Sequence, residues 1–170
     1  MSSHAREPLG MPPGTLNARG EWWGLVKKND GEWNEFNADA VSLFDHPQGL
    51  YFSGVMNPQG NASTITVQLA PDIQSGSYYW DAPNQNGVVR VDYYPSNHDR
   101  HIAQSGEIHL ARILSPSRVF GALLFKTSRS DGTRYEVETE FLVIDSSASS
   151  PQFNSPLRER SRWAPAKKYP

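Results

Sequence analysis

The densest group of chemically capable side chains lies between Asn97 and His101. This run reads Asn-His-Asp-Arg-His, and His109 follows eight residues later. Imidazoles and carboxylates bind zinc and related metals when they converge, so a metal-dependent hydrolase is one interpretation. The candidate ligands are His98, Asp99, His101 and His109. The spacing fits a polar hairpin loop with solvated histidines better, so no metal or other cofactor is expected.

A second candidate group is a row of three glutamates. Glu136, Glu138 and Glu140 alternate with apolar residues, so in a strand all three lie on one face, about 6.5–7 Å apart. Such carboxylates suit a hard cation or the paired acids of a glycosidase. A solvent-facing edge strand carries the same pattern by default, and Lys126 or Arg134 can neutralise it.

Several catalytic signatures are missing from the sequence. It has no Gly-x-Ser-x-Gly elbow and no Gly-rich phosphate-binding motif. Its lack of cysteine excludes disulfides, thiolate nucleophiles and Cys-ligated metals. Enzymatic activity is therefore left open, and the sequence favours a protein without it.

Consecutive aromatic residues are the stronger signal for binding. The runs Tyr78-Tyr79-Trp80 and Tyr93-Tyr94 cannot place every ring on one face of a strand. Exposed rings suit a protein partner or the apolar face of a glycan, whereas inward rings of a barrel suit a small apolar ligand. The candidate binding residues are Tyr79, Trp80, Tyr93 and Tyr94.

The elements that must position these residues read as strands. Apolar and polar residues alternate over 64–69 and 135–143, and β-branched or aromatic residues fill 88–94. The segment 37–44 suits a helical turn or a short strand, and the strand is preferred. The pattern predicts an all-β antiparallel sandwich or barrel of about eight to nine strands, with the sandwich slightly favoured.

One hairpin is specified by its turn residues. Ser130-Asp131-Gly132 lies between the apolar run 119–125 and the alternating run 135–143. Asp-Gly readily adopts the positive φ that tight hairpins require. We therefore expect these two runs to be paired neighbours.

Some of these residues resemble the signature of lipocalin-like barrels. The first-strand Gly-x-Trp has counterparts in Gly20-Glu21-Trp22 and Gly31-Glu32-Trp33, and Asp92-Tyr93 matches the later Asp-Tyr. Arg112 or Arg118 corresponds to the arginine that packs over the first-strand Trp. The resemblance implies a carrier of a small apolar ligand.

A longer stretch, about 65–143, is similar to small bacterial all-β proteins of unknown function. Their pattern is matched by Gly76-Ser77-Tyr78, by the Ser-Gly-x-Ile-x-Leu run 105–110, and by Gly121 and Phe141. Those proteins are often lipoproteins with a lipidated cysteine, which this chain lacks. The resemblance implies a fold and no activity.

Charge divides the chain into three parts. Residues 20–146 contain 9 basic and 16 acidic residues, a net −7, whereas 147–170 contain five basic residues and one acidic residue, a net +4. We expect a flexible leader over 1–19, one domain over 20–146, and a flexible basic tail over 147–170. If the tail is disordered, deleting 155–170 should barely change thermal stability, whereas a large loss would show that it docks on the acidic domain. The acidic domain should repel nucleic acid.

These observations lead to three functional hypotheses. The first is a non-catalytic binding or protein-interaction module that uses an aromatic-rich surface, and the second is the lipocalin-like carrier. The third is the metal-dependent hydrolase. No apolar run approaches the roughly 18 residues of a membrane span, and no secretory signal is evident, so a cytoplasmic location is expected. The oligomeric state stays open.

Overall fold

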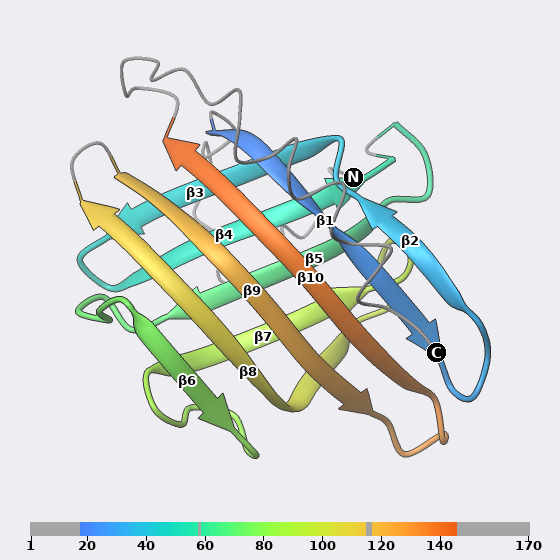
Figure 1. Ribbon diagram of the computed structural model, residues 1–170. Coiled ribbons are helices and arrows are strands. Elements are labelled where there is room, and N and C mark those ends of the chain that lie inside the picture. The colour runs from blue at the N-terminus through green and yellow to red at the C-terminus, as the bar shows by residue number, and fades with distance from the viewer. Residues whose placement is uncertain (1–17, 58, 115–116, 146–170) are drawn as a thin grey trace, which may run out of the picture.

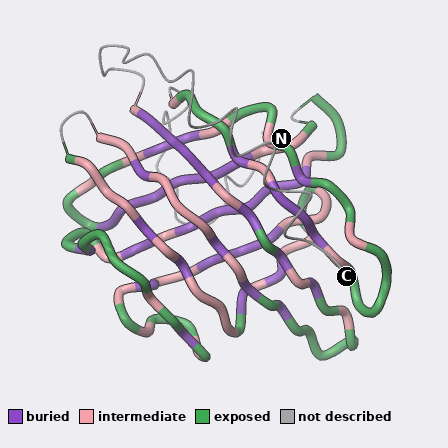
Figure 2. The backbone as a smooth tube through the Cα atoms, viewed as in Figure 1, coloured by how far each residue is buried: buried purple, intermediate pink, exposed green. Residues whose placement is uncertain are grey.

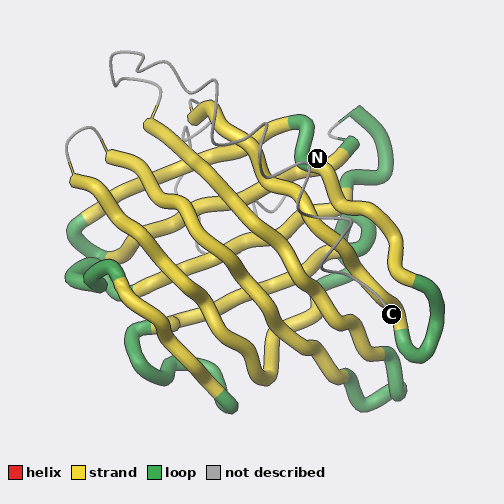
Figure 3. Tube along the Cα trace, in the orientation of Figure 1, coloured by secondary structure: helices red, strands yellow, loops and turns green. Residues whose placement is uncertain are grey.

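The computed structural model describes residues 18–57, 59–114 and 117–145. Within these ranges the chain forms strands and turns and no helix, which confirms the all-β prediction (Figure 3). The described residues accordingly include no helix long and apolar enough to cross a membrane. The predicted leader over 1–19 and the basic tail over 147–170 lie almost wholly outside these ranges.

Ten strands make up the described part of the chain. They are β1 (Ala18–Lys28), β2 (Trp33–Asn37), β3 (Ala40–His46), β4 (Gly49–Met56), β5 (Ser63–Leu69), β6 (Gly76–Trp80), β7 (Val88–Tyr94), β8 (His101–Leu114), β9 (Ser117–Ser128) and β10 (Arg134–Asp145). The ambiguous segment 37–44 is largely strand β3, as preferred. Strand β2 is not among the predicted strands; it is a short edge strand in which only Phe36 is buried.

All strand pairings are antiparallel and belong to one curled sheet. The order is β2-β1-β10-β9-β8-β7-β5-β4-β3, and β6 pairs with β8 beside this path. Figure 1 shows β10, β9 and β8 crossing over β3, β4, β5 and β7. The sheet is curled into a half-barrel, which confirms the predicted antiparallel all-β class.

The core fills the space between the two crossing halves. The rings of Trp22, Phe52 and Phe141 lie 5.0–5.6 Å apart, and each is at most 1% exposed. Figure 2 shows buried positions along both halves of the sheet. Burial of these large apolar side chains joins the halves.

Strand β8 belongs to both halves and carries an irregularity at Gln104. Its first residues pair with β7, and from Ala103 onward it pairs with β9. Ala103 is opposite Thr127 and Ser105 is opposite Lys126, so Gln104 is an extra residue, as in a β-bulge. Because one extra residue reverses the side on which later side chains point, the bulge decides what β8 presents to solvent.

The predicted hairpin between β9 and β10 is confirmed. Gly132 has a φ of +84°, and the Asp131 carboxylate accepts a hydrogen bond from the Thr133 N–H at 2.9 Å. The turn sets a register in which Glu136 is opposite Lys126 and Glu138 is opposite Leu124. It therefore positions the acidic row that dominates the outer face.

Candidate functional site

The four aromatic candidates divide between the core and the surface. Trp80 is 4% exposed and Tyr93 is 6% exposed, and both belong to the hydrophobic core. Tyr79 is 58% exposed, and Tyr94 is half-buried. The expectation that all four rings form one contact surface is therefore corrected, because strand alternation turns Trp80 and Tyr93 inward.

The four candidate metal ligands do not converge. His101 is buried, His109 lies on the outer face of β8, and His98 is exposed in a turn with a φ of +69°. Among the described residues no group of three His, Asp or Glu side chains is placed to hold a metal ion. The bulge at Gln104 is the physical reason, since it puts His101 and His109 on opposite faces of β8.

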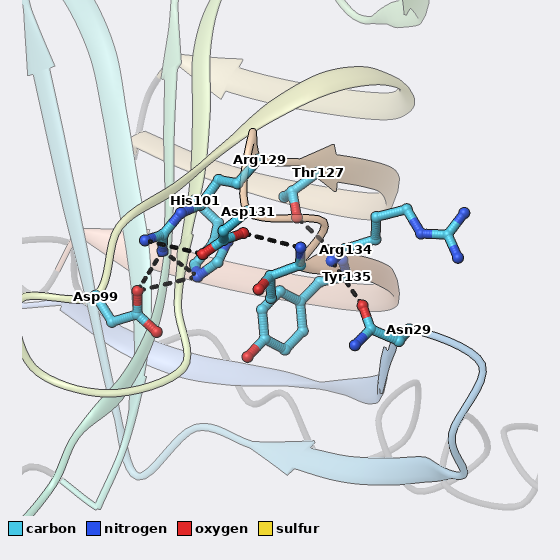
Figure 4. A network of polar contacts seen from close by, with 9 residues as sticks. Asn29, Asp99, His101, Thr127, Arg129, Asp131, Arg134 and Tyr135 are labelled. Atoms are coloured by element: carbon cyan, nitrogen blue, oxygen red, sulfur yellow. Dashed lines mark hydrogen bonds and ion pairs between the residues drawn. The ribbon is translucent and has the colours of Figure 1, made fainter.

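Two of those candidates instead form an ionic network at the β9–β10 hairpin (Figure 4). Asp99 accepts a hydrogen bond from Arg129, and His101 Nε2 lies 3.1 Å from Asp99 Oδ1 and 2.8 Å from Arg129 Nη1. Partial burial acts to raise the pKa of Asp99, but these bonds outweigh it and hold the pKa below the ordinary value of 3.8. The ring of His101 packs edge-on against Tyr135 at 4.8 Å. The network ties the β7–β8 loop to the hairpin.

This network predicts a change in acid sensitivity. A carboxyl whose pKa is lowered by folding stabilises the protein above its unfolded pKa of about 3.8, and that contribution is lost as the pH falls through the folded pKa. Arg129→Gln should therefore reduce the difference in urea midpoint between pH 7 and pH 3. Arg134→Gln is the matched control, because Arg134 is an exposed arginine 3.7 Å from Asp30. Equal pH dependence in both variants would contradict this role of Arg129.

The outer face of the sheet contains a groove where β6, β8, β9 and β10 lie side by side. Strand register places Tyr79 opposite Glu107, Glu107 opposite Leu124, and Leu124 opposite Glu138. One row of side chains thus alternates between apolar and acidic across four strands. The hollow has a volume of about 370 Å³. It is lined by Tyr79, Ser105, Gly106, Glu107, Leu124, Phe125, Lys126, Glu136, Val137 and Glu138.

A chain of polar contacts supports one wall of the groove. Ser77 Oγ lies 2.7 Å from His109 Nδ1, and His109 Nε2 lies 3.3 Å from Glu107 Oε2. The ring of Tyr79 meets that of His109 edge-on, with centroids 6.1 Å apart. These contacts restrict the orientation of the imidazole and hold it against the ring of Tyr79.

The same three polar residues are the types that nucleophilic hydrolases use. A serine becomes a nucleophile when a histidine base, oriented by a carboxylate, acts in a site that excludes water. Here Ser77 is exposed, and the side chain of His109 is 43% exposed. Solvent weakens such electrostatic activation.

The charge of the groove is negative. Its lining includes the carboxylates of Glu107, Glu136 and Glu138 and one ammonium group, that of Lys126. Glu136 pairs with Lys27 at 2.9 Å and with Lys126 at 3.7 Å, and the hydrogen bond from Lys27 lowers the pKa of Glu136. Glu138 is exposed beside Leu124. A cationic group with an apolar neighbour fits this lining.

Only part of this site could be predicted from the sequence. Tyr79 and the glutamate row were among the predicted residues. The alternation along β10 places Glu136 and Glu138 on the outer face. Ser77, Glu107 and Leu124 were not predicted as site residues. Glu107 and His109 are two residues apart beyond the bulge, and that spacing was the available signal for a shared face.

No protein-family model, no curated protein and no solved structure matches the chain.

Proposed function

We propose that this protein is a binding module that takes a basic, extended peptide segment of a protein partner into the groove of β6, β8, β9 and β10. The observation that carries the proposal is one row of side chains: the exposed ring of Tyr79, then Glu107, Leu124 and Glu138. Apolar contact and negative charge alternate along it. An Arg or Lys side chain has both complementary parts, an apolar stem and a cationic head.

Tyr79 is the natural anchor of such a contact. Its side chain is 58% exposed, whereas most large apolar residues of the described chain are in the core. Aromatic rings at the centre of an interface contribute more binding energy than most other contacts. A guanidinium or ammonium group over the ring gains a further cation–π attraction.

The acidic surroundings select the class of partner. Glu107, Glu136 and Glu138 repel phosphate groups, which argues against nucleic acid. They attract positively charged segments and speed up their encounter with the groove. Among the partners considered from sequence, a basic protein segment fits better than a neutral glycan.

The packed interior favours the outer surface over an internal ligand site. A lipocalin-like carrier needs a cavity inside the barrel, but Trp22, Phe52 and Phe141 occupy the centre in mutual contact. The outer groove of about 370 Å³ is open to a ligand without displacing these rings.

Binding to a peptide array would test the proposal. The full chain should retain ten-residue peptides with three Arg or Lys and one Trp, and should not retain copies with Gln at the basic positions. Tyr79→Ala should weaken binding about tenfold or more, because truncating a central aromatic anchor costs at least about 1.4 kcal/mol. Glu138→Gln should weaken it less.

The control for this experiment is Glu21→Gln. Glu21 is an exposed glutamate on β1 opposite Leu142, on the same outer face but outside the groove lining. It should leave binding unchanged. Equal binding to the wild type and to Tyr79→Ala would overturn the assignment of the groove.

A further inference from the structure

We propose that the chain carries its own ligand for this groove: the basic segment 156–168, which binds there until a partner displaces it. The inference rests on the proposed function, because it assigns an internal competitor to the same site. The segment reads Pro-Leu-Arg-Glu-Arg-Ser-Arg-Trp-Ala-Pro-Ala-Lys-Lys. It has the chemistry that the groove selects.

Charge complementarity is the first argument. The segment holds five basic residues and one acidic residue, whereas residues 20–146 carry a net −7. Its three arginines alternate with other residues at 158, 160 and 162, the spacing at which an extended peptide presents one face. Leu157 and Trp163, at the two ends of this run, add apolar side chains to the segment.

The point where the described chain ends is the second argument. The described chain ends at Asp145, the last residue of β10, and Glu138 lies seven residues earlier on the same strand. Seven strand residues cover about 23 Å. The twelve residues 146–157 can span up to about 40 Å, so Arg158 can reach back to the groove.

Burial on the outer face is the third argument. Leu142 and Ile144 alternate with the core residues Phe141 and Val143, so they point outward from β10. They are nevertheless 6% and 2% exposed, and neither belongs to the core cluster. A segment that runs from Asp145 back towards Glu138 would pass over these two side chains, and their low exposure is what such a path would produce.

Internal binding has a regulatory consequence. A tethered ligand acts at an effective concentration on the order of millimolar, so a partner in solution must compete with it. Only partners that bind tightly or in several copies then displace the segment. Modification that lowers its positive charge opens the groove.

A spin label on the segment tests its position. The chain has no cysteine, so Ser161→Cys in the full chain provides a single attachment site between Arg160 and Arg162. A nitroxide there should broaden the backbone amide signals of Lys126, Val137 and Glu138, which line the groove. Adding the substitutions Arg158→Glu, Arg160→Glu and Arg162→Glu should restore those signals.

Two results would overturn the proposal. One is unchanged groove signals with the label at Ser161→Cys. The other is broadening that arises only from a label at Ser3→Cys, which would make the leader the occupant. The leader is the weaker candidate by charge, with two basic residues and one acidic residue over 1–19.

Peptide binding separates failure of this inference from failure of the proposed function. If the segment occupies the groove, the variant with three glutamates at 158, 160 and 162 should bind a basic array peptide about tenfold more tightly than the wild type. Equal, Tyr79-dependent binding by both chains would overturn the inference and support the proposed function. Broadening at the groove with no peptide bound by either chain would support internal docking and overturn the proposed function.

Discussion

Replacing Gly121 by alanine should destabilise the protein by about 4 kcal/mol or more, near the upper end of single-substitution effects. Gly121 lies within β9, between Leu110 of β8 and Phe141 of β10, and has a φ of +153°. A Cβ atom there would overlap the backbone carbonyl oxygen of His109, and β8 and β9 would have to separate. Because His109 supports the groove wall, the site should be lost together with stability.

The measurement is urea unfolding followed by far-UV circular dichroism, with Gly60→Ala as the matched control. A Cβ at Gly60 would meet no atom within 4 Å, so that variant should differ from the wild type by less than about 0.5 kcal/mol. Similar urea midpoints for Gly121→Ala and the wild type would contradict the close approach of Gly121 on β9 to the His109 carbonyl oxygen on β8.

Trp22→Ala should cost about 3–5 kcal/mol of unfolding free energy, the usual effect of emptying a large buried aromatic site. Trp22 is 1% exposed, and its ring lies 5.6 Å from Phe52 on β4 and 5.3 Å from Phe141 on β10. It also covers Gly54, where an added Cβ would come within 3.0 Å of the indole. The ring therefore joins the two crossing halves of the half-barrel.

Tyr79→Ala is the control for this second prediction. It also truncates an aromatic ring, but from a position 58% exposed, so it should change stability by less than about 0.5 kcal/mol. Thermal unfolding of the two variants side by side would compare them directly. A comparable loss in both would mean that the centre between the halves is not packed as described.

The parts of the fold that depend on local pattern could be predicted from sequence. Strand β10 was recognised because its apolar and acidic residues alternate with a period of two, which is a property of the strand alone. The β9–β10 hairpin was recognised because Asp131-Gly132 suits the positive φ of its turn. Strand β2 was missed, since a short edge strand buries too little to leave a pattern.

Whether the candidate metal ligands converge depends on information that no local pattern contains. His101 and His109 are eight residues apart, and an even spacing in a regular strand places both side chains on one face. The extra residue Gln104 separates their faces, and its existence is visible only in the pairing of β8 with β9. The inward position of Trp80, opposite Gly106, is likewise a result of pairing.

The all-β class, the acidic charge of the domain and the outward direction of the glutamate row follow from the amino-acid sequence without knowledge of the fold. Each follows from composition or from the alternation of side chains along one strand. The tertiary structure alone decided that Tyr79, Glu107, Leu124 and Glu138 form one row. These residues belong to four strands, and the register between strands is set by turns, bulges and core packing far apart in the chain, so no single segment specifies their meeting.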